Sequence, residues 1–182
     1  MTIIIILAVV AALVLWFISV QRKLVSQDEM CKNSLSQIGV QQSSRWDALT
    51  ALVELVKSYN EHEYNTLRDV IAQRRQTDGS SSVEEVENQE KAISGAMRKL
   101  NVVVEQYPDL KASDNYTRAM DSVNTYENQV RMSRMVYNDT VTQYNRTIRQ
   151  IPDSFVAGAL HFAERKYLEV EQEKTAMPSM KI

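Results

Sequence analysis

Three charged residues stand at positions where the surrounding pattern is apolar, and they are the strongest candidates for chemistry in this chain. Arg45 falls in one heptad-like pattern, and Glu127 and Arg134 fall in another. Because an unpaired charge in a helical core is costly, we expect Glu127 to pair with Arg134 along its own face or with Arg45 across an interface. A carboxylate beside arginine stays ionised and is a poor proton donor near neutral pH. We therefore predict a structural ion-pair network that fixes helix register, rather than a catalytic carboxylate.

His62 and Glu63 are the other pair that could do chemistry, as ligands of a metal ion. Together with His161 and Cys31 they leave the chain with two histidines and one cysteine. A zinc site needs three or four ligands at suitable spacing, and the sequence contains neither an HExxH pattern nor a second cysteine. It also contains no phosphate-binding loop, nucleophile elbow or catalytic triad. We expect no catalytic residue, no metal and no cofactor, and an enzyme is the least favoured class.

The eight tyrosines could be read as the wall of a ligand cage, but their spacing favours a simpler role. Four of them recur in the stretch expected to form one long helix, where tyrosine rings commonly fill a bundle core and place their hydroxyls at its rim. We predict this core-filling role for them. These four are Tyr116, Tyr126, Tyr137 and Tyr144.

These residues must be positioned by a chain that begins with a membrane helix. Residues 3–20 are apolar apart from Ser19, which is the length and composition that spans a bilayer. No basic region precedes this run and no small-residue cleavage site follows it, so we predict an uncleaved anchor. Arg22 and Lys23 follow the run directly, which places the remainder of the chain in the cytoplasm by the positive-inside rule.

About 160 residues follow the anchor, and their composition is that of a helical domain. The whole chain has four glycines, three prolines and a net charge of −2. Mixed charges of this kind create no basic field, so nucleic acid is not expected as a partner. The single thiol, Cys31, cannot form an intramolecular disulfide, which agrees with a reducing compartment.

Apolar spacing predicts four helices after the anchor. Alternating steps of four and three indicate one continuous helix from the anchor to about Arg75, and a second from Val83 to Gln106 after a cap within Ser80–Ser82. A third begins at Ser113 or Asp114 and stops before Pro152, and a last helix, capped by Asp153 or Ser154, carries Phe155, Leu160, Phe162 and Tyr167. The predicted fold is all-α: a transmembrane helix continuing into a long stalk and an antiparallel, four-helix-type bundle. The predicted domains are the anchor (1–20), stalk (21–44), bundle (45–174) and tail (175–182).

The lengths of the first two helices predict an uncovered stalk. The first would extend about 80 Å beyond the bilayer, whereas the second returns only about 35 Å. The stalk then carries an apolar stripe without a partner from its own chain, and we expect this stripe to pack against other copies in an oligomer. The alternatives are that the C-terminal segment folds back along the stalk, or that the helix breaks near Gly39. The stripe includes Leu24, Cys31, Leu35 and Ile38.

Several motifs resemble the LemA family of bacterial single-pass membrane proteins along nearly the whole chain. The resemblance implies an N-terminal membrane anchor followed by a long-helix bundle, and no established enzymatic activity. The family is also similar to magnetosome membrane proteins, and its members often accompany membrane metalloproteases in genomes. This chain departs from the family pattern at Gly39–Ser44, where a more basic segment is usual. The matching residues are Arg45–Leu49, Leu52–Glu54, His62–Glu63, Tyr107–Ala112, Tyr126–Val130, Arg134, Tyr137–Asp139, Val141, Tyr144–Asn145 and Pro152.

Together these features favour a membrane-anchored helical scaffold or adaptor that self-associates and organises partners at the bacterial inner membrane. The expected partners are the lipid bilayer, further copies of the chain, and an unidentified membrane protein. The alternative from another class is an accessory regulator of a membrane protease or envelope stress system.

Overall fold

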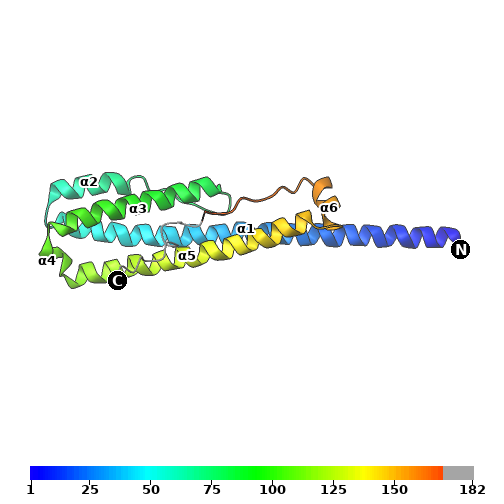
Figure 1. The fold of residues 1–182 in the computed structure, drawn as a ribbon, viewed down its shortest axis with the longest axis horizontal. Helices are drawn as coiled ribbons and strands as arrows, with labels where there is room; N and C mark the ends of the chain where they lie inside the picture. The colour runs from blue at the N-terminus through cyan, green and yellow to red at the C-terminus, as the bar shows by residue number, and fades with distance from the viewer. Residues whose placement is uncertain (170–182) are drawn as a thin grey trace, which may run out of the picture.

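The computed structural model describes residues 1–169, which form an elongated all-α molecule without strands (Figure 1). The all-α prediction is confirmed. The predicted tail (175–182) and the end of the last predicted helix lie outside the described residues. The helices are α1 (Thr2–Lys57), α2 (Glu61–Ile71), α3 (Val83–Glu105), α4 (Pro108–Lys111), α5 (Asp114–Arg149) and α6 (Asp153–Ala159).

Helix α1 is the axis of the molecule. Its 56 residues correspond to a length of about 84 Å, and the helix continues without interruption from the apolar run into the bundle. The apolar run is exposed on all sides up to Ser19. Among the described residues, α1 is the one helix that is long and apolar enough to cross a membrane.

The prediction of a continuous helix to about Arg75 is wrong, because α1 ends at Lys57 and α2 folds back beside it. Asn60 is the N-cap of α2, and its Oδ1 accepts hydrogen bonds from the backbone amides of His62 (2.9 Å) and Glu63 (3.3 Å). The apolar spacing continues across the break because α2 also buries Leu67 and Val70 against the bundle. In the sequence, the start of α2 is indicated by Asn60, a favoured N-cap residue, and by the acidic residues Glu61 and Glu63 in the first turn after it.

The remaining helix starts follow the capping residues that the sequence offers. Ser82 and Glu85 form a reciprocal capping box at the start of α3, and the Ser113 hydroxyl caps α5. Helix α6, in contrast, ends at Ala159, so the predicted helix through Tyr167 is wrong beyond that point. Residues 160–169, which we call the strap, leave the helix and run without regular secondary structure along the bundle (Figure 1).

Two hydrophobic cores lie along α1. The distal core, far from the apolar run, is enclosed by α1, α2, α3, α4 and the first half of α5. The proximal core lies between the membrane-proximal half of α1, the second half of α5, α6 and the strap. Members of the distal core include Trp46, Leu49, Leu52, Leu67, Ile93, Leu100 and Tyr116. Members of the proximal core include Leu24, Cys31, Leu35, Ile38, Tyr137, Tyr144, Val156 and Leu168.

The loop between α2 and α3 lies directly on α1 near the boundary of the two cores. A Cβ atom added to Gly39 would lie 2.0 Å from the carbonyl oxygen of Thr77, so only glycine permits this approach. Helix α1 passes through Gly39 unbroken, and the alternative of a break at this position is wrong.

Candidate functional site

The predicted ion pair between α1 and α5 is present, with a third member on α3. Arg45 Nη2 lies 3.1 Å from Glu127 Oε2, and Arg45 Nη1 lies 2.5 Å from Glu90 Oε1. The Arg45 side chain is buried, whereas Glu127 is about 39% exposed at the edge of the bundle. Gln42 extends the cluster by donating to the carbonyl oxygen of Val86 (3.0 Å). The cluster joins α1, α3 and α5.

Arg134 lies on α5, half-buried at the edge of the helix pair. Its guanidinium donates a hydrogen bond to the carbonyl oxygen of Glu169 at the end of the strap. The observed contact therefore connects Arg134 with the strap. Sequence reasoning missed both this role and Glu90, because it considered only charges on the apolar seams.

The four stalk residues lie in the proximal core of their own chain. Leu24, Cys31 and Ile38 are fully buried and Leu35 is nearly so. The expectation that this stripe lacks a partner from its own chain is wrong. Helix α5 has 36 residues, so it runs back along α1 for about 54 Å, and the strap covers a further side. The alternative, in which the C-terminal segment folds back along the stalk, describes the structure.

Two Tyr-Asn pairs on α5 hold the strap by its backbone. The Asn145 side chain accepts a hydrogen bond from the amide of Arg165 and donates one to its carbonyl oxygen, both at 2.9 Å. The Tyr144 hydroxyl donates to the carbonyl oxygen of Ala163 (3.0 Å). Three strap backbone groups thus receive partners from two adjacent side chains.

The same arrangement repeats one heptad earlier on α5. Asn138 makes both bonds to Leu168, its Oδ1 accepting from the amide and its Nδ2 donating to the carbonyl oxygen, each at 3.0 Å. The Tyr137 hydroxyl donates to the carbonyl oxygen of Lys166 (3.0 Å). Seven helical residues rise about 10.5 Å, and three extended residues span about 10 Å. The repeat on α5 therefore matches every third residue of the strap.

Burial supports the donor role of the two tyrosines. It raises the pKa of both Tyr137 and Tyr144, so their hydroxyls keep their protons and can donate. Both rings fill the proximal core, as the sequence predicts, but their hydroxyls meet the strap rather than solvent. The signal for this role was an asparagine following tyrosine at an interval of seven residues.

Side chains of the strap add a charged and an apolar anchor. Arg165 Nη2 lies 2.6 Å from Asp28 Oδ1 on α1, and Leu168 is almost completely buried in the proximal core. Burial raises the pKa of Asp28, but hydrogen bonds from Arg165 and Lys32 outweigh it and the net pKa lies below the usual value. Burial raises the pKa of the Cys31 thiol, which leaves it protonated and a weak nucleophile.

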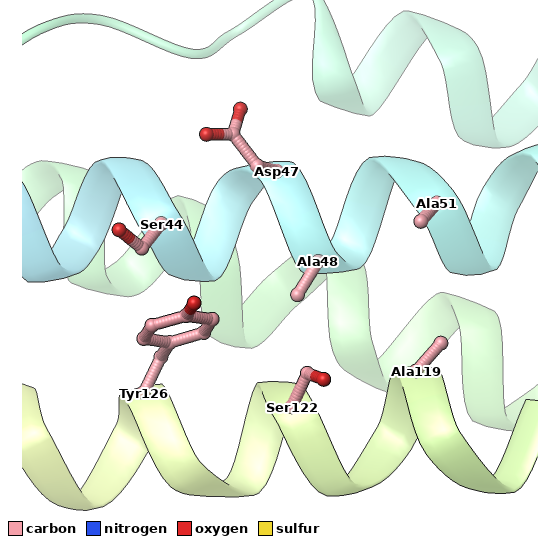
Figure 2. Close-up of a pocket in the computed structure, with 7 residues that line it drawn as sticks. All are labelled: Ser44, Asp47, Ala48, Ala51, Ala119, Ser122 and Tyr126. Carbon is pink, nitrogen blue, oxygen red and sulfur yellow. The ribbon is translucent and has the colours of Figure 1, made fainter.

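A second feature is an open groove between α1 and α5, on the surface of the bundle (Figure 2). Small side chains on both helices leave a space of about 260 Å³, and the Tyr126 ring closes one side of it. A similar groove lies further along the same helix pair, between Gln37 on α1 and Met132 and Val136 on α5. The lining residues of the first groove are Ser44, Asp47, Ala48, Ala51, Ala119, Ser122 and Tyr126.

Within residues 1–169, no three His, Cys, Asp or Glu side chains gather as they would around a metal ion. His62 and Glu63 lie in the first turn of α2, where their backbone amides complete the Asn60 cap. These features are suited to binding. Side chains of α5 bond the backbone of an extended segment, and open grooves lie between α1 and α5.

The sequence matches the LemA family over residues 34–182, most of its length. The chain belongs to the LemA family. The match includes the Tyr-Asn pairs, the strap and the ion-pair cluster. Family membership and the apolar end of α1 together indicate a membrane-associated LemA-type protein.

Three relatives have names that bear on this conclusion. Protein LemA of Metamycoplasma hominis is 29% identical over 142 residues, which cover 74% of this chain and 63% of that protein. Magnetosome proteins MamQ 1 and MamQ 2 of Paramagnetospirillum magneticum are each 32% identical over 84 residues, or 46% of this chain and 30% of theirs. The LemA-family chain therefore spans less than two thirds of the length of these relatives.

Proposed function

We propose that this LemA-family protein is a membrane-anchored scaffold or adaptor of the bacterial inner membrane, without enzymatic activity. The observation that supports it best is the continuity of α1, in which the apolar run and the central helix of the bundle are one helix. A continuous helix transmits the orientation of the anchor to the bundle. The surfaces of the bundle are then held at a fixed distance from the anchor along α1.

The bundle is proposed to face the cytoplasm. Arg22 and Lys23 are exposed immediately after the apolar run, where the positive-inside rule applies most directly. A cysteine-reactive reagent that cannot cross the membrane tests this orientation in intact cells, with a cysteine placed at exposed Val102 on α3. We expect labelling only after the cells are opened.

The grooves between α1 and α5 are the surface that we assign to self-association. The stalk stripe is already covered, so it is not available to a second copy. In contrast, Val40, Met132 and Val136 are each more than half exposed on this helix pair. Apolar side chains exposed together on a helix pair favour contact with another helix.

The mass of the full-length protein in mild detergent, after subtraction of the detergent, tests this assignment. We expect a discrete oligomer that dissociates in a variant with Met132→Glu and Val136→Glu. Val102→Glu, an equally exposed position on α3, is the matched control and should leave the mass unchanged.

A monomeric wild-type protein would contradict self-association. If crosslinking in the membrane then captured a protease in constant ratio, the role of accessory protease regulator would replace that of scaffold.

A further inference from the structure

The turn between α5 and the strap lies at the level where the apolar run of α1 ends. Helix α5 runs antiparallel to α1, and the strap returns in the opposite direction, so residues 150–159 form the proximal tip of the bundle (Figure 1). Lys23 Nζ lies 2.8 Å from Asp153 Oδ2 at the start of α6. Val156 and Ala157 on the inner side of α6 belong to the same core as Val20 and Leu24.

The outer side of this tip is apolar. Ile151 is 78% exposed and Phe155 is 70% exposed, and Leu160 at the end of α6 is also exposed. Large apolar side chains gathered at one tip are unfavourable in water. The tip therefore presents a surface that is suited to an apolar environment.

The position of the anchor identifies that environment as the bilayer interface. Lys23 follows the last residue of the apolar run, Val20, by three residues, or about 4.5 Å of helix. The polar layer on each side of the hydrocarbon is about 5 to 7 Å thick. Asp153, held by Lys23, thus lies at the depth of the lipid headgroups when α1 spans the membrane.

Four basic residues lie near the tip, and two of them, Lys23 and Arg149, are paired with carboxylates, so the net charge there is positive. Arg146 and Arg149 occupy the last turn of α5, and Arg22 and Lys23 lie on α1. The carboxylates at the tip are engaged, with Asp153 bound to Lys23 and Glu164 lying 3.7 Å from Arg149. Arginine and lysine beside exposed apolar residues are the composition that binds the surface of an anionic bilayer.

We propose that the tip formed by residues 150–159 is a second membrane contact, which inserts Ile151 and Phe155 into the interface of the bilayer that holds α1. This inference rests on the proposed membrane anchoring. With two contacts, the membrane fixes both the tilt of the bundle and its rotation about α1, which a single helix leaves free. The grooves between α1 and α5 would then face a fixed direction in the plane of the membrane.

Tryptophan quenching in vesicles tests the contact in the full-length protein. The chain has two tryptophans, Trp16 in the apolar run and Trp46 buried in the distal core. In a Trp16→Phe background, Phe155→Trp places a reporter at the tip, and Val102→Trp places an equally exposed one on α3 as the control. The vesicles contain phosphatidylcholine and phosphatidylglycerol with brominated acyl chains, which quench fluorophores at the hydrocarbon boundary.

We expect quenching of the Phe155→Trp protein to exceed that of the Val102→Trp protein by at least about twofold, because only the tip enters the interface. Equal quenching of the two variants would overturn the proposed contact. Quenching of Trp16 in a protein that retains it tests the insertion of α1 separately from the contact at the tip. If Trp16 is quenched and the tip is not, α1 is inserted and the second contact is absent, whereas an unquenched Trp16 would contradict the anchoring itself.

Discussion

The distal and proximal cores meet the same requirement, the burial of one side of α1, with different kinds of structure. In the distal core the covering elements are helices, whose backbone groups are satisfied within each helix. In the proximal core part of the cover is the strap, whose amides and carbonyls have no such internal partners. The proximal core therefore contains polar side chains that serve the strap backbone, namely Tyr137, Asn138, Tyr144 and Asn145.

This difference shows why asparagine occurs in a buried stripe of α5. Asn145 is 5% exposed, and a buried amide is costly unless it is fully bonded. Its oxygen and nitrogen both bond to one strap residue, in the manner of a neighbouring β-strand. A helix with asparagine every seven residues can therefore act as a docking edge for an extended chain.

The largest effect is expected from a leucine of the distal core. Leu100→Ala should lower the free energy of unfolding by about 4 kcal/mol, because Leu100 is fully buried among helices that unfold together. Leu168→Ala on the strap removes an equally buried side chain, but we expect it to act mainly on local release of the strap. Urea denaturation monitored at Trp46, together with hydrogen exchange of the strap, measures both. Equal global effects of the two substitutions would contradict the distinction between the cores.

The next largest effect is expected from the two Tyr-Asn pairs on α5, whose hydrogen bonds to the strap backbone we call the ladder. The double substitution Asn138→Ala and Asn145→Ala removes four hydrogen bonds to the strap, which at about 0.5 to 1.5 kcal/mol each should weaken its docking by about 3 kcal/mol. Hydrogen exchange of the strap should accelerate about a hundredfold. Asn124→Ala, at an exposed asparagine two further steps along the heptad series, is the control. Unchanged exchange in the double variant would refute the ladder.

Sequence patterns predicted the distal half of the molecule better than the proximal half. The apolar periodicity, the Ser82 and Ser113 caps and Pro108 located α3 and the start of α5 closely, because helices of the distal core bury regular stripes. The same periodicity hid the break at Asn60, since α2 continues the spacing of α1. In the strap, the apolar residues Leu160, Phe162 and Tyr167 were interpreted as the continuation of a helix. The stalk stripe that the strap covers was therefore interpreted as a surface for other copies.

The cost of burying a charge led to two predicted partners for Glu127, Arg134 and Arg45, and the structure has Arg45 and Glu127 3.1 Å apart. The partner on α3, Glu90, could not be found in this way. Its place beside Arg45 depends on the angle at which α3 returns along α1, and that angle follows from tertiary packing.

Acid should weaken the proximal core through Asp28. The folded-state pKa of Asp28 is lowered, so the stabilisation from its pair with Arg165 is fully present above the unfolded pKa of about 3.9 and is lost as the pH falls through the folded value. Asp28→Asn should therefore weaken docking of the strap by about 2 kcal/mol near neutral pH. Below the folded-state pKa the two proteins should become alike. A difference that persists unchanged into strong acid would show that the charge of Asp28 is not its source.

The smallest effect is expected at the edge of the ion-pair cluster. Glu127→Gln should change the free energy of unfolding by less than about 1 kcal/mol, because this carboxylate is partly exposed and solvent screens its attraction to Arg45. Arg45→Met should lower the free energy of unfolding more, since it leaves the largely buried carboxylate of Glu90 without its cation. Thermal unfolding of both variants in detergent measures the difference. A larger loss of stability in Glu127→Gln than in Arg45→Met would contradict the assignment of Arg45 as the buried member and Glu127 as the exposed one.

Hydrogen exchange at the amides of Arg165 and Leu168 in the full-length protein tests most directly whether the strap completes the proximal core. Each amide donates to an asparagine side chain on α5. Because neither amide lies in a helix, its protection from exchange measures the bond to that asparagine. We predict slow exchange at both amides, slower than at Tyr167 between them, to which neither asparagine is bonded. Exchange of Arg165 and Leu168 at the rates of an unfolded peptide would mean that the strap is not docked and that the stalk stripe is open to another partner.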